Sequence, residues 1–294
     1  MTNDASRPTR STRSWLDAQG TEIDEEDRGL VYDMTTLVNR RSALGLFGGV
    51  SVLTLLAACG MAPESTPTST STPTSGSTDT ATDGDGDLTE IPDETGGPYP
   101  GDGSNGVNVL DDSGIVRSDI RSSFGSSTVT AEGVPLTIAL TVRDAATGDA
   151  LAGGAVYLWH CDRDGNYSLY SDGLDDVNYL RGVQEIGADG SVTFTTIFPA
   201  CYSGRWPHIH FEVYSDVATA VASGPIVKTS QLALPKDTCQ TVYATSGYEQ
   251  SVNNLAQVSL ASDNVFGDDQ GIHQIATMTG SVATGYTAAL TIGV

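Results

Sequence analysis

Basic residues are scarce in this sequence. Lysine and arginine together number 14 in 294 residues, against 37 aspartate and glutamate residues, and the formal net charge is −23. Nucleic-acid binding needs a basic surface, so the scarcity argues against nucleic-acid partners. It equally argues against adsorption to anionic lipid by charge. The acidity fits a well-solvated protein and by itself says nothing about the fold.

Cysteine is also rare, with 4 residues in the chain, and no Cys-x-x-Cys pair occurs. The spacing therefore does not indicate a structural zinc site. Cys59 belongs to a leader segment, which leaves Cys161, Cys201 and Cys239 for the folded part. An odd number of cysteines leaves at least one thiol free, while an oxidising compartment permits a disulfide between two of them. We expect Cys201 and Cys239 to form that pair.

The leader lacks an apolar run of full membrane-spanning length. The run from Ala43 to Ala58 is uncharged but short, and it suits the hydrophobic region of a signal peptide. A buried helix is disfavoured because the run has no amphipathic period. The preceding Arg40-Arg41 suggests twin-arginine export of a folded protein. The run ends in Leu-Ala-Ala-Cys59, which resembles a bacterial lipobox in which Cys59 is lipidated and becomes the mature N-terminus.

Export would place the protein on the outer face of the cell membrane as a lipoprotein, or outside the cell. Residues 1–33 are acidic and long for the start of a signal peptide, so Met34 is an alternative start that N-terminal sequencing of the precursor would test. Residues 60–90 are rich in Ser, Thr, Pro, Gly and Asp, a composition that predicts a disordered tether. We therefore expect a signal segment over 1–59, a tether over 60–90 and one folded domain over 91–294.

Helix signals are weak throughout the folded domain, and strand signals are strong. Apolar and polar residues alternate with period 2 from Leu136 to Val142. The turn 188–190 predicts a hairpin that leads into a strand. The predicted strands cover 136–142, 156–161, 191–197, 208–214 and 231–234. Gly/Asp/Asn-rich loops separate them, which is typical of an all-β protein with a β-sandwich fold.

Two of the 4 histidines, His208 and His210, lie on the predicted strand 208–214. Because successive strand side chains point to opposite faces, these two imidazoles share one face, and Ile209 and Phe211 share the other. Neutral imidazoles at this spacing suit Zn, Cu, Fe or Ni. Tyr202 lies just upstream, and its phenolate is a hard anionic donor that favours Fe(III) over Zn(II).

Two segments resemble motifs of the intradiol ring-cleavage dioxygenases, in particular their secreted bacterial branch. They are Trp159-His-Cys-Asp162 with Gly165-Asn-Tyr-Ser168, and Phe198-Pro-Ala-Cys-Tyr202 with Gly204-Arg205 and Pro207-His-Ile-His-Phe211. Further likenesses are Glu94-Thr-Gly-Gly-Pro-Tyr99, Arg117-Ser-Asp-Ile-Arg121, Leu180-Arg-Gly-Val-Gln184 and the run that begins at Gln231. The resemblance covers roughly residues 92–294.

The resemblance implies a β-sandwich that holds a non-haem Fe(III). It assigns as iron ligands Tyr167, Tyr202, His208 and His210. Tyr202 and His210 would be axial, and Tyr202 would also accept a substrate proton.

The same resemblance places Arg205 over the substrate ring, where it would stabilise developing negative charge, and Gln231 near the substrate pocket. The implied reaction is cleavage of a catechol-type diol by O2 between its two hydroxyls, which gives a cis,cis-muconate-type product. The implied partners are therefore a small aromatic diol and O2.

Two other functions stay open on the sequence alone. One is a surface-tethered β-sandwich binding module without catalysis, and the other is a zinc hydrolase that uses His208 and His210. The chain also departs from the family pattern, because Ala200 and Cys201 stand in the Pro-Gly-x-Tyr segment and the helical dimerisation domain is absent. The choice between a catechol and a hydroxyquinol, and the oligomeric state, therefore stay open. We expect His160 to be a satisfied core or near-site residue, and His273 to be structural or exposed.

Overall fold

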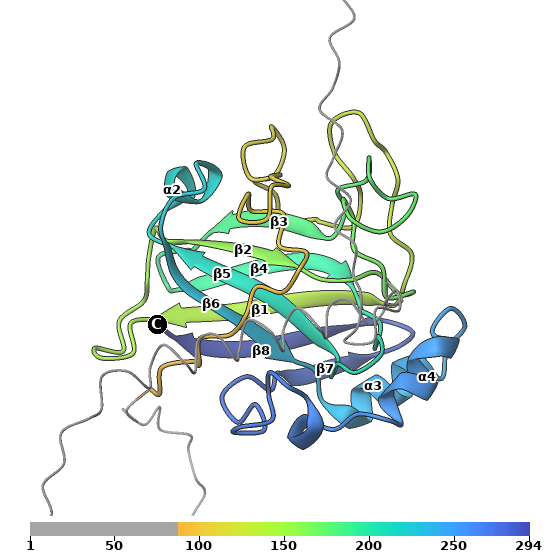
Figure 1. Cartoon of the computed structure of the whole chain (residues 1–294). Coiled ribbons are helices and arrows are strands. Elements are labelled where there is room, and N and C mark those ends of the chain that lie inside the picture. Colours follow the sequence, from red (N-terminus) through yellow and green to blue (C-terminus); the bar gives the residue numbers. More distant parts are fainter. Residues whose placement is uncertain (1–87) are drawn as a thin grey trace, which may run out of the picture.

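The computed structural model describes residues 88–294, which form two four-stranded sheets (Figure 1). One sheet has the order β4-β1-β8-β7 and the other the order β3-β2-β5-β6. The first contains β1 (Pro135–Arg143), β4 (Ser191–Ile197), β7 (Thr277–Ser281) and β8 (Gly285–Gly293). The second contains β2 (Ala155–Trp159), β3 (Arg181–Glu185), β5 (His208–Tyr214) and β6 (Ile226–Ala233). The predicted all-β sandwich is confirmed.

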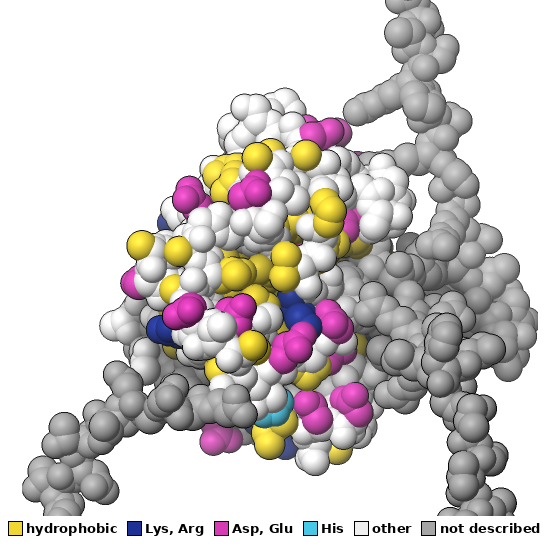
Figure 2. Space-filling model, turned by 90° about the vertical axis from the view of Figure 1, so that its left-hand side faces the viewer, with side chains coloured by type: hydrophobic (Ala, Val, Ile, Leu, Met, Phe, Trp, Pro, Cys, Tyr) yellow, Lys and Arg dark blue, Asp and Glu magenta, His cyan; other side chains and the backbone are white. Residues whose placement is uncertain are grey.

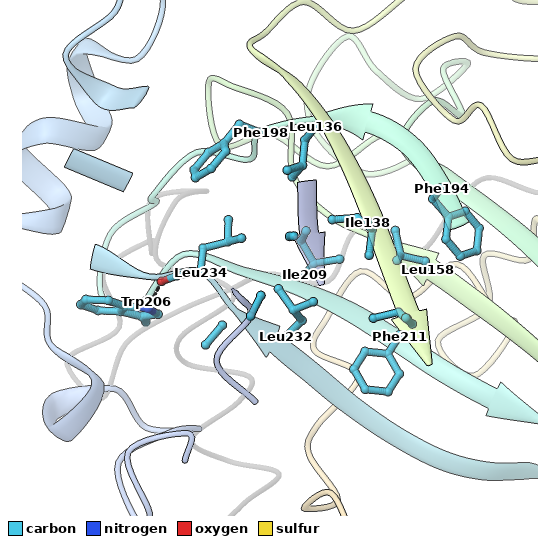
Figure 3. Close-up of a cluster of buried hydrophobic side chains, with 14 of the residues drawn as sticks. Leu136, Ile138, Leu158, Phe194, Phe198, Trp206, Ile209, Phe211, Leu232 and Leu234 are labelled. Atoms are coloured by element: carbon cyan, nitrogen blue, oxygen red, sulfur yellow. Dashed lines mark hydrogen bonds between the residues drawn. The ribbon is translucent and has the colours of Figure 1, made fainter. Parts of the chain in front are cut away.

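The core lies between the two sheets and consists of the apolar side chains that alternate along each strand. In β1, Leu136, Ile138 and Leu140 are buried while the residues between them are partly exposed. Figure 3 shows Leu136 and Ile138 facing Ile209 across the space between the sheets. The sandwich is therefore held together chiefly by apolar burial, which is worth about 25 cal/mol per Å² of area removed from water.

Three short helices of the described segment pack at the margins of the sheets. They are α2 (Val217–Val221), α3 (Lys236–Tyr243) and α4 (Glu249–Leu255), with a 3₁₀ turn at Leu260–Ser262. The sequence analysis missed these helices and strands β3, β7 and β8. The pattern of β7, Thr-Met-Thr-Gly-Ser, lacks apolar alternation because this edge strand is largely exposed. None of the helices in the described part of the chain is long and apolar enough to span a membrane.

The predicted hairpin at 188–190 was wrong. A turn is present, with the Gly190 N–H donating to the Gly187 carbonyl at 2.9 Å. However, the turn joins β3 to β4, and these strands belong to different sheets. The chain crosses over the edge of the sandwich here, because β3 pairs with β2 and β4 pairs with β1. Local turn chemistry predicted the reversal but not the partner of each strand.

The predicted Cys201–Cys239 disulfide was also wrong, because Cys161, Cys201 and Cys239 are all free and buried. The Cys201 thiol donates to the Arg205 carbonyl at 3.4 Å, and the Cys239 thiol donates to the Leu234 carbonyl at 3.8 Å. Burial raises the pKa of Cys201 to about 12. The thiols therefore stay protonated and act as small core residues.

The segment 88–100 is hydrogen-bonded to strands of both sheets, β8 and β6. The Ile91 N–H donates to the Gly293 carbonyl at 2.9 Å, and the Glu94 N–H donates to the Thr229 carbonyl at 2.8 Å. Ile91 is buried in the core. The segment therefore packs as part of the folded domain. The predicted signal, Cys59 and tether lie outside the described residues.

Candidate active site

The site is built on the outer face of the sheet β3-β2-β5-β6. Strand β5 is buried on both faces: Ile209 and Phe211 enter the core, and His208 and His210 point to the outer face. His210 lies opposite Trp159 of β2 and opposite Gln231 of β6. The predicted alternation along 208–214 therefore places both imidazoles where the sequence analysis expected them.

Three donor atoms converge at this point. The Tyr202 hydroxyl lies 3.1 Å from His208 Nε2, and His208 Nε2 lies 3.1 Å from His210 Nε2. His208 Nδ1 lies 2.6 Å from the Trp206 carbonyl, which can only accept, so Nδ1 carries the proton and Nε2 keeps its lone pair. Burial is the main cause that holds the pKa of both histidines well below the usual range. Neutral imidazoles so close together are suited to bind a metal ion.

Tyr167 borders the same point. Its ring centroid lies 6.1 Å from that of Tyr202 and 6.3 Å from that of His210. Its hydroxyl is buried and makes no hydrogen bond within the described part of the chain. Burial raises the pKa of Tyr167 well above its ordinary value, and the nearby Tyr202 adds to the effect.

A phenol buried in this way would ionise only beside a strong positive charge, so this donor set fits a highly charged cation. The two phenols and two imidazoles that the sequence analysis singled out thus lie close together. Among residues 88–294, no group of three or more His, Cys, Asp and Glu side chains is arranged so that it could hold a metal ion.

Arg205 is wholly buried beside the donors, where it pairs with an acid that the sequence analysis did not single out. Its Nε donates to Asp263 Oδ2 at 3.0 Å, and both side chains are 0 % exposed. Its Nη2 donates to Gln231 Oε1 at 2.7 Å, and Gln231 Nε2 donates to the Thr95 carbonyl at 2.8 Å. Gln231 therefore holds Arg205 and links it to the segment 88–100.

Sequence reasoning missed Asp263 because the loop that carries it has no recognisable motif. Both oxygens of the Asp263 carboxylate accept two hydrogen bonds each. Oδ2 also accepts from the Trp206 N–H at 2.6 Å, while Oδ1 accepts from the N–H groups of Val265 and Phe266 at 2.8 and 3.0 Å. These bonds fix the carboxylate, and the carboxylate in turn fixes the direction of the Arg205 guanidinium.

Arg181 ties the Tyr167 loop to the segment 88–100. All five of its N–H donors have acceptors: the Ser168 hydroxyl and carbonyl, the Pro100 and Tyr99 carbonyls, and the Tyr157 hydroxyl, at 2.8 to 3.1 Å. The Tyr99 ring lies 5.0 Å from that of Tyr167. A guanidinium fork therefore holds together the two loops that border the donors.

The other two histidines and two tyrosines of the loop after Tyr167 do not join the donors. His160 is buried and bonded through both ring nitrogens, to the Cys161 carbonyl and the Thr196 hydroxyl, each at 2.7 Å. His273 is exposed. The Tyr179 hydroxyl donates to Asp162 Oδ2 at 3.0 Å, and the Tyr170 hydroxyl donates to Asn105 Oδ1 at 2.9 Å. His160 and His273 therefore do not belong to the site. The residues that the structure brings together are Tyr167, Tyr202, His208, His210, Arg205 and Gln231.

Glu94 is a buried acid near Arg205. Burial, with a contribution from Asp268, raises its pKa from 4.5 to about 8, although Arg205 and Gln274 act in the opposite direction. A carboxyl whose pKa is raised on folding contributes stability that is fully present below pH 4.5 and is lost as the pH rises through about 8. The Glu94 carboxyl therefore lowers the free energy of unfolding as the pH rises from 4.5 to about 8.

Between pH 4.5 and about pH 8, we expect the Glu94→Gln variant to lose less stability than the unmodified protein, by an amount on the order of a few kcal/mol. Urea unfolding at each pH measures the difference. The pKa of Glu212 is also raised to about 8, so Glu212 contributes equally to the pH dependence of stability in both proteins. The exposed Glu185→Gln variant is the control. Parallel pH profiles for Glu94→Gln and the unmodified protein would contradict the expectation.

Comparisons with known proteins agree with this geometry. A family model described as Dioxygenase matches residues 121–221. A chlorocatechol 1,2-dioxygenase of Rhodococcus opacus is 40% identical over 95 residues. An intradiol ring-cleavage dioxygenase from Tetranychus urticae superposes with a TM-score of 0.52 at 26% identity, covering 62% of this chain and 87% of its own. The chain is thus similar to intradiol ring-cleavage dioxygenases in part of its sequence and in its fold.

A further dioxygenase crystal structure superposes with a TM-score of 0.56 at 25% identity, covering 70% of this chain and 94% of its own. The match to the Rhodococcus opacus enzyme covers 26% of this chain and 37% of that relative. The likeness to intradiol dioxygenases thus includes the fold of most of the described residues, while the curated relative is matched over a limited part of its length.

Proposed function

We propose that this protein is a non-haem Fe(III) intradiol dioxygenase that cleaves a catechol-type aromatic diol with O2 between the two hydroxyls. The observation that carries the proposal is the convergence of three donor atoms. His208 Nε2 lies 3.1 Å from the Tyr202 hydroxyl and 3.1 Å from His210 Nε2. The buried hydroxyl of Tyr167 completes a donor set of two phenols and two imidazoles.

Tyr167, Tyr202, His208 and His210 would hold the iron. When bound, Fe(III) would supply Lewis acidity toward the two diol oxygens and draw electron density from the ring, which makes the ring reactive toward O2. Tyr202 would accept a proton from a substrate hydroxyl at its own phenolate oxygen, so that it acts as a base as well as a ligand. His208 would keep its orientation through the Nδ1 bond to the Trp206 carbonyl.

Arg205 would stabilise negative charge that develops on the substrate ring. Its guanidinium is buried and held by Asp263 and Gln231, so it needs little reorganisation during the reaction. Electrostatic stabilisation of this kind is strongest where water is excluded, and Arg205 is wholly buried. The product would be of the cis,cis-muconate type.

The substrate is a neutral catechol or hydroxyquinol in this proposal. Acidic side chains outnumber basic ones on the face shown in Figure 2, and this surface would disfavour highly anionic substrates at low salt. The proposed place of action is outside the cytoplasm, after twin-arginine-type export, with attachment to the membrane only through a lipid at Cys59. The diol would then come from the surroundings of the cell.

The test is a visible absorption spectrum of the purified protein before and after anaerobic addition of catechol. We expect a red-brown tyrosinate-to-Fe(III) band that moves to longer wavelength when catechol binds. Admission of O2 should then yield a muconate-type product. A protein that stays colourless after ferric iron is supplied would overturn the iron assignment and, with it, the dioxygenase proposal.

A further inference from the structure

The two histidines of the site are supported in different ways. His208 is oriented by its Nδ1 bond to the Trp206 carbonyl at 2.6 Å. His210 Nδ1 is buried and has no hydrogen-bond partner among residues 88–294. A histidine that binds a metal normally uses its other ring nitrogen to fix the orientation of the ring. His210 therefore depends on another contact for its orientation.

Trp159 supplies that contact. The two residues are directly opposed on neighbouring strands, and their ring centroids lie 4.9 Å apart with an interplanar angle of 4°. The other two rings beside His210 belong to Tyr167 and His208, and they meet it at 62° and 82°. Edge contacts of that kind restrict how close the rings approach, whereas a parallel stack restricts rotation of the imidazole plane itself.

Trp159 is itself held rigidly from its other side. Its ring is stacked on that of Tyr157 at 4.9 Å and 22°. The Tyr157 hydroxyl donates to the Pro100 carbonyl at 2.6 Å and accepts from Arg181 Nη1 at 3.1 Å. Tyr157, Trp159 and His210 thus form a continuous stack across two strands, anchored at its outer end by hydrogen bonds.

The indole N–H of Trp159 is buried and donates no hydrogen bond to any described residue. Its side chain is 0 % exposed. A purely apolar side chain would fill this position without the cost of an unpaired donor. A hydrogen bond therefore does not account for the tryptophan, and its observed contact with the site is the parallel ring stack on His210.

We propose that Trp159 is a positioning residue that sets the ring plane of His210 by parallel stacking. The proposal rests on the proposed function, because it treats His210 as an iron ligand. Trp159 acts through His210 and need not touch the substrate. Its effect should therefore be visible in iron binding and in the electronic environment of the iron, independently of turnover.

The test compares Trp159→Phe, which keeps a flat ring, with Trp159→Leu, which removes it. Phe194→Leu is the matched control, since Phe194 is wholly buried in β4 of the other sheet. Each purified protein is titrated with ferric iron in competition with nitrilotriacetate, and its electron paramagnetic resonance spectrum is recorded at full loading. We expect Trp159→Leu to weaken ferric binding by about 10- to 100-fold, and Trp159→Phe by no more than about 3-fold.

The resonance spectrum provides a readout that a loss of general stability would not change. We expect the rhombicity of the high-spin ferric signal to change in Trp159→Leu and to be unchanged in Trp159→Phe and Phe194→Leu. If Trp159→Leu does not fold, Trp159→Met takes its place, because a flexible thioether fills the space without a ring plane. Equal ferric affinity and an unchanged signal in the ring-free variant would overturn the role of Trp159.

The same titration separates the two proposals. If the unmodified protein binds no ferric iron, the proposed function fails and the role of Trp159 fails with it. If the unmodified protein binds iron and the ring-free variant binds it equally well, only the role of Trp159 fails.

Discussion

Replacing His210 by alanine is expected to weaken ferric binding by more than about 100-fold and to abolish the visible tyrosinate band. His210 Nε2 lies 3.1 Å from His208 Nε2, so its removal takes away one of the converging donors. Removal of a ligand should weaken ferric binding more than removal of a residue that only positions a ligand. Iron content after dialysis, together with the visible spectrum, measures the effect.

His273→Ala is the control for the histidine substitution. His273 is exposed, so its removal should leave iron content and colour unchanged. Circular dichroism of His210→Ala should retain the β spectrum, because the fold depends on the core between the sheets rather than on the outer face of β5. An iron content in His210→Ala equal to that of the unmodified protein would remove His210 from the ligand set.

The second large effect is expected for Arg205→Ala. If the guanidinium stabilises charge developing on the ring, kcat should fall by about 10²- to 10³-fold while iron and catechol binding persist. Single-turnover kinetics on the anaerobic catechol complex, started by O2, measures the chemical step directly. An unchanged rate would exclude Arg205 from the mechanism.

Arg205→Ala also leaves the buried Asp263 carboxylate without its partner, and a broken buried ion pair typically costs about 3–5 kcal/mol. The double variant Arg205→Ala/Asp263→Asn removes that unpaired charge. We expect the double variant to regain much of the stability in urea unfolding and none of the lost rate. Recovery of the rate together with stability would mean that Arg205 supports the fold of the site rather than the reaction.

The sequence predicted much of the site because the relevant residues are close together in the chain. His208 and His210 share a face through the period of the strand, and Tyr202 lies in the loop before it, so local geometry is sufficient. Tyr167 could be assigned only through the Gly165-Asn-Tyr-Ser168 likeness, because nothing in its local pattern indicates that its loop folds beside β5.

Contacts between distant residues were not predictable in the same way. Asp263 meets Arg205 across 58 positions, and no turn or strand period relates them. The errors have the same origin: turn chemistry at 188–190 predicted a reversal, but the pairing of β3 and β4 with different sheets depends on the whole sandwich. The incorrect disulfide followed from counting cysteines, which contains no information on where each thiol points.

The sequence by itself determined the all-β class, the strand faces, and the two imidazoles that lie on one of them. Alternation and loop composition act over a few residues, so they can be interpreted without the fold. Only the tertiary structure decided which side chains face one another across the sheets: Asp263 against Arg205, Arg181 between two loops, and Trp159 parallel to His210. Those contacts depend on strand order and register, which the packing of the two sheets sets as a whole.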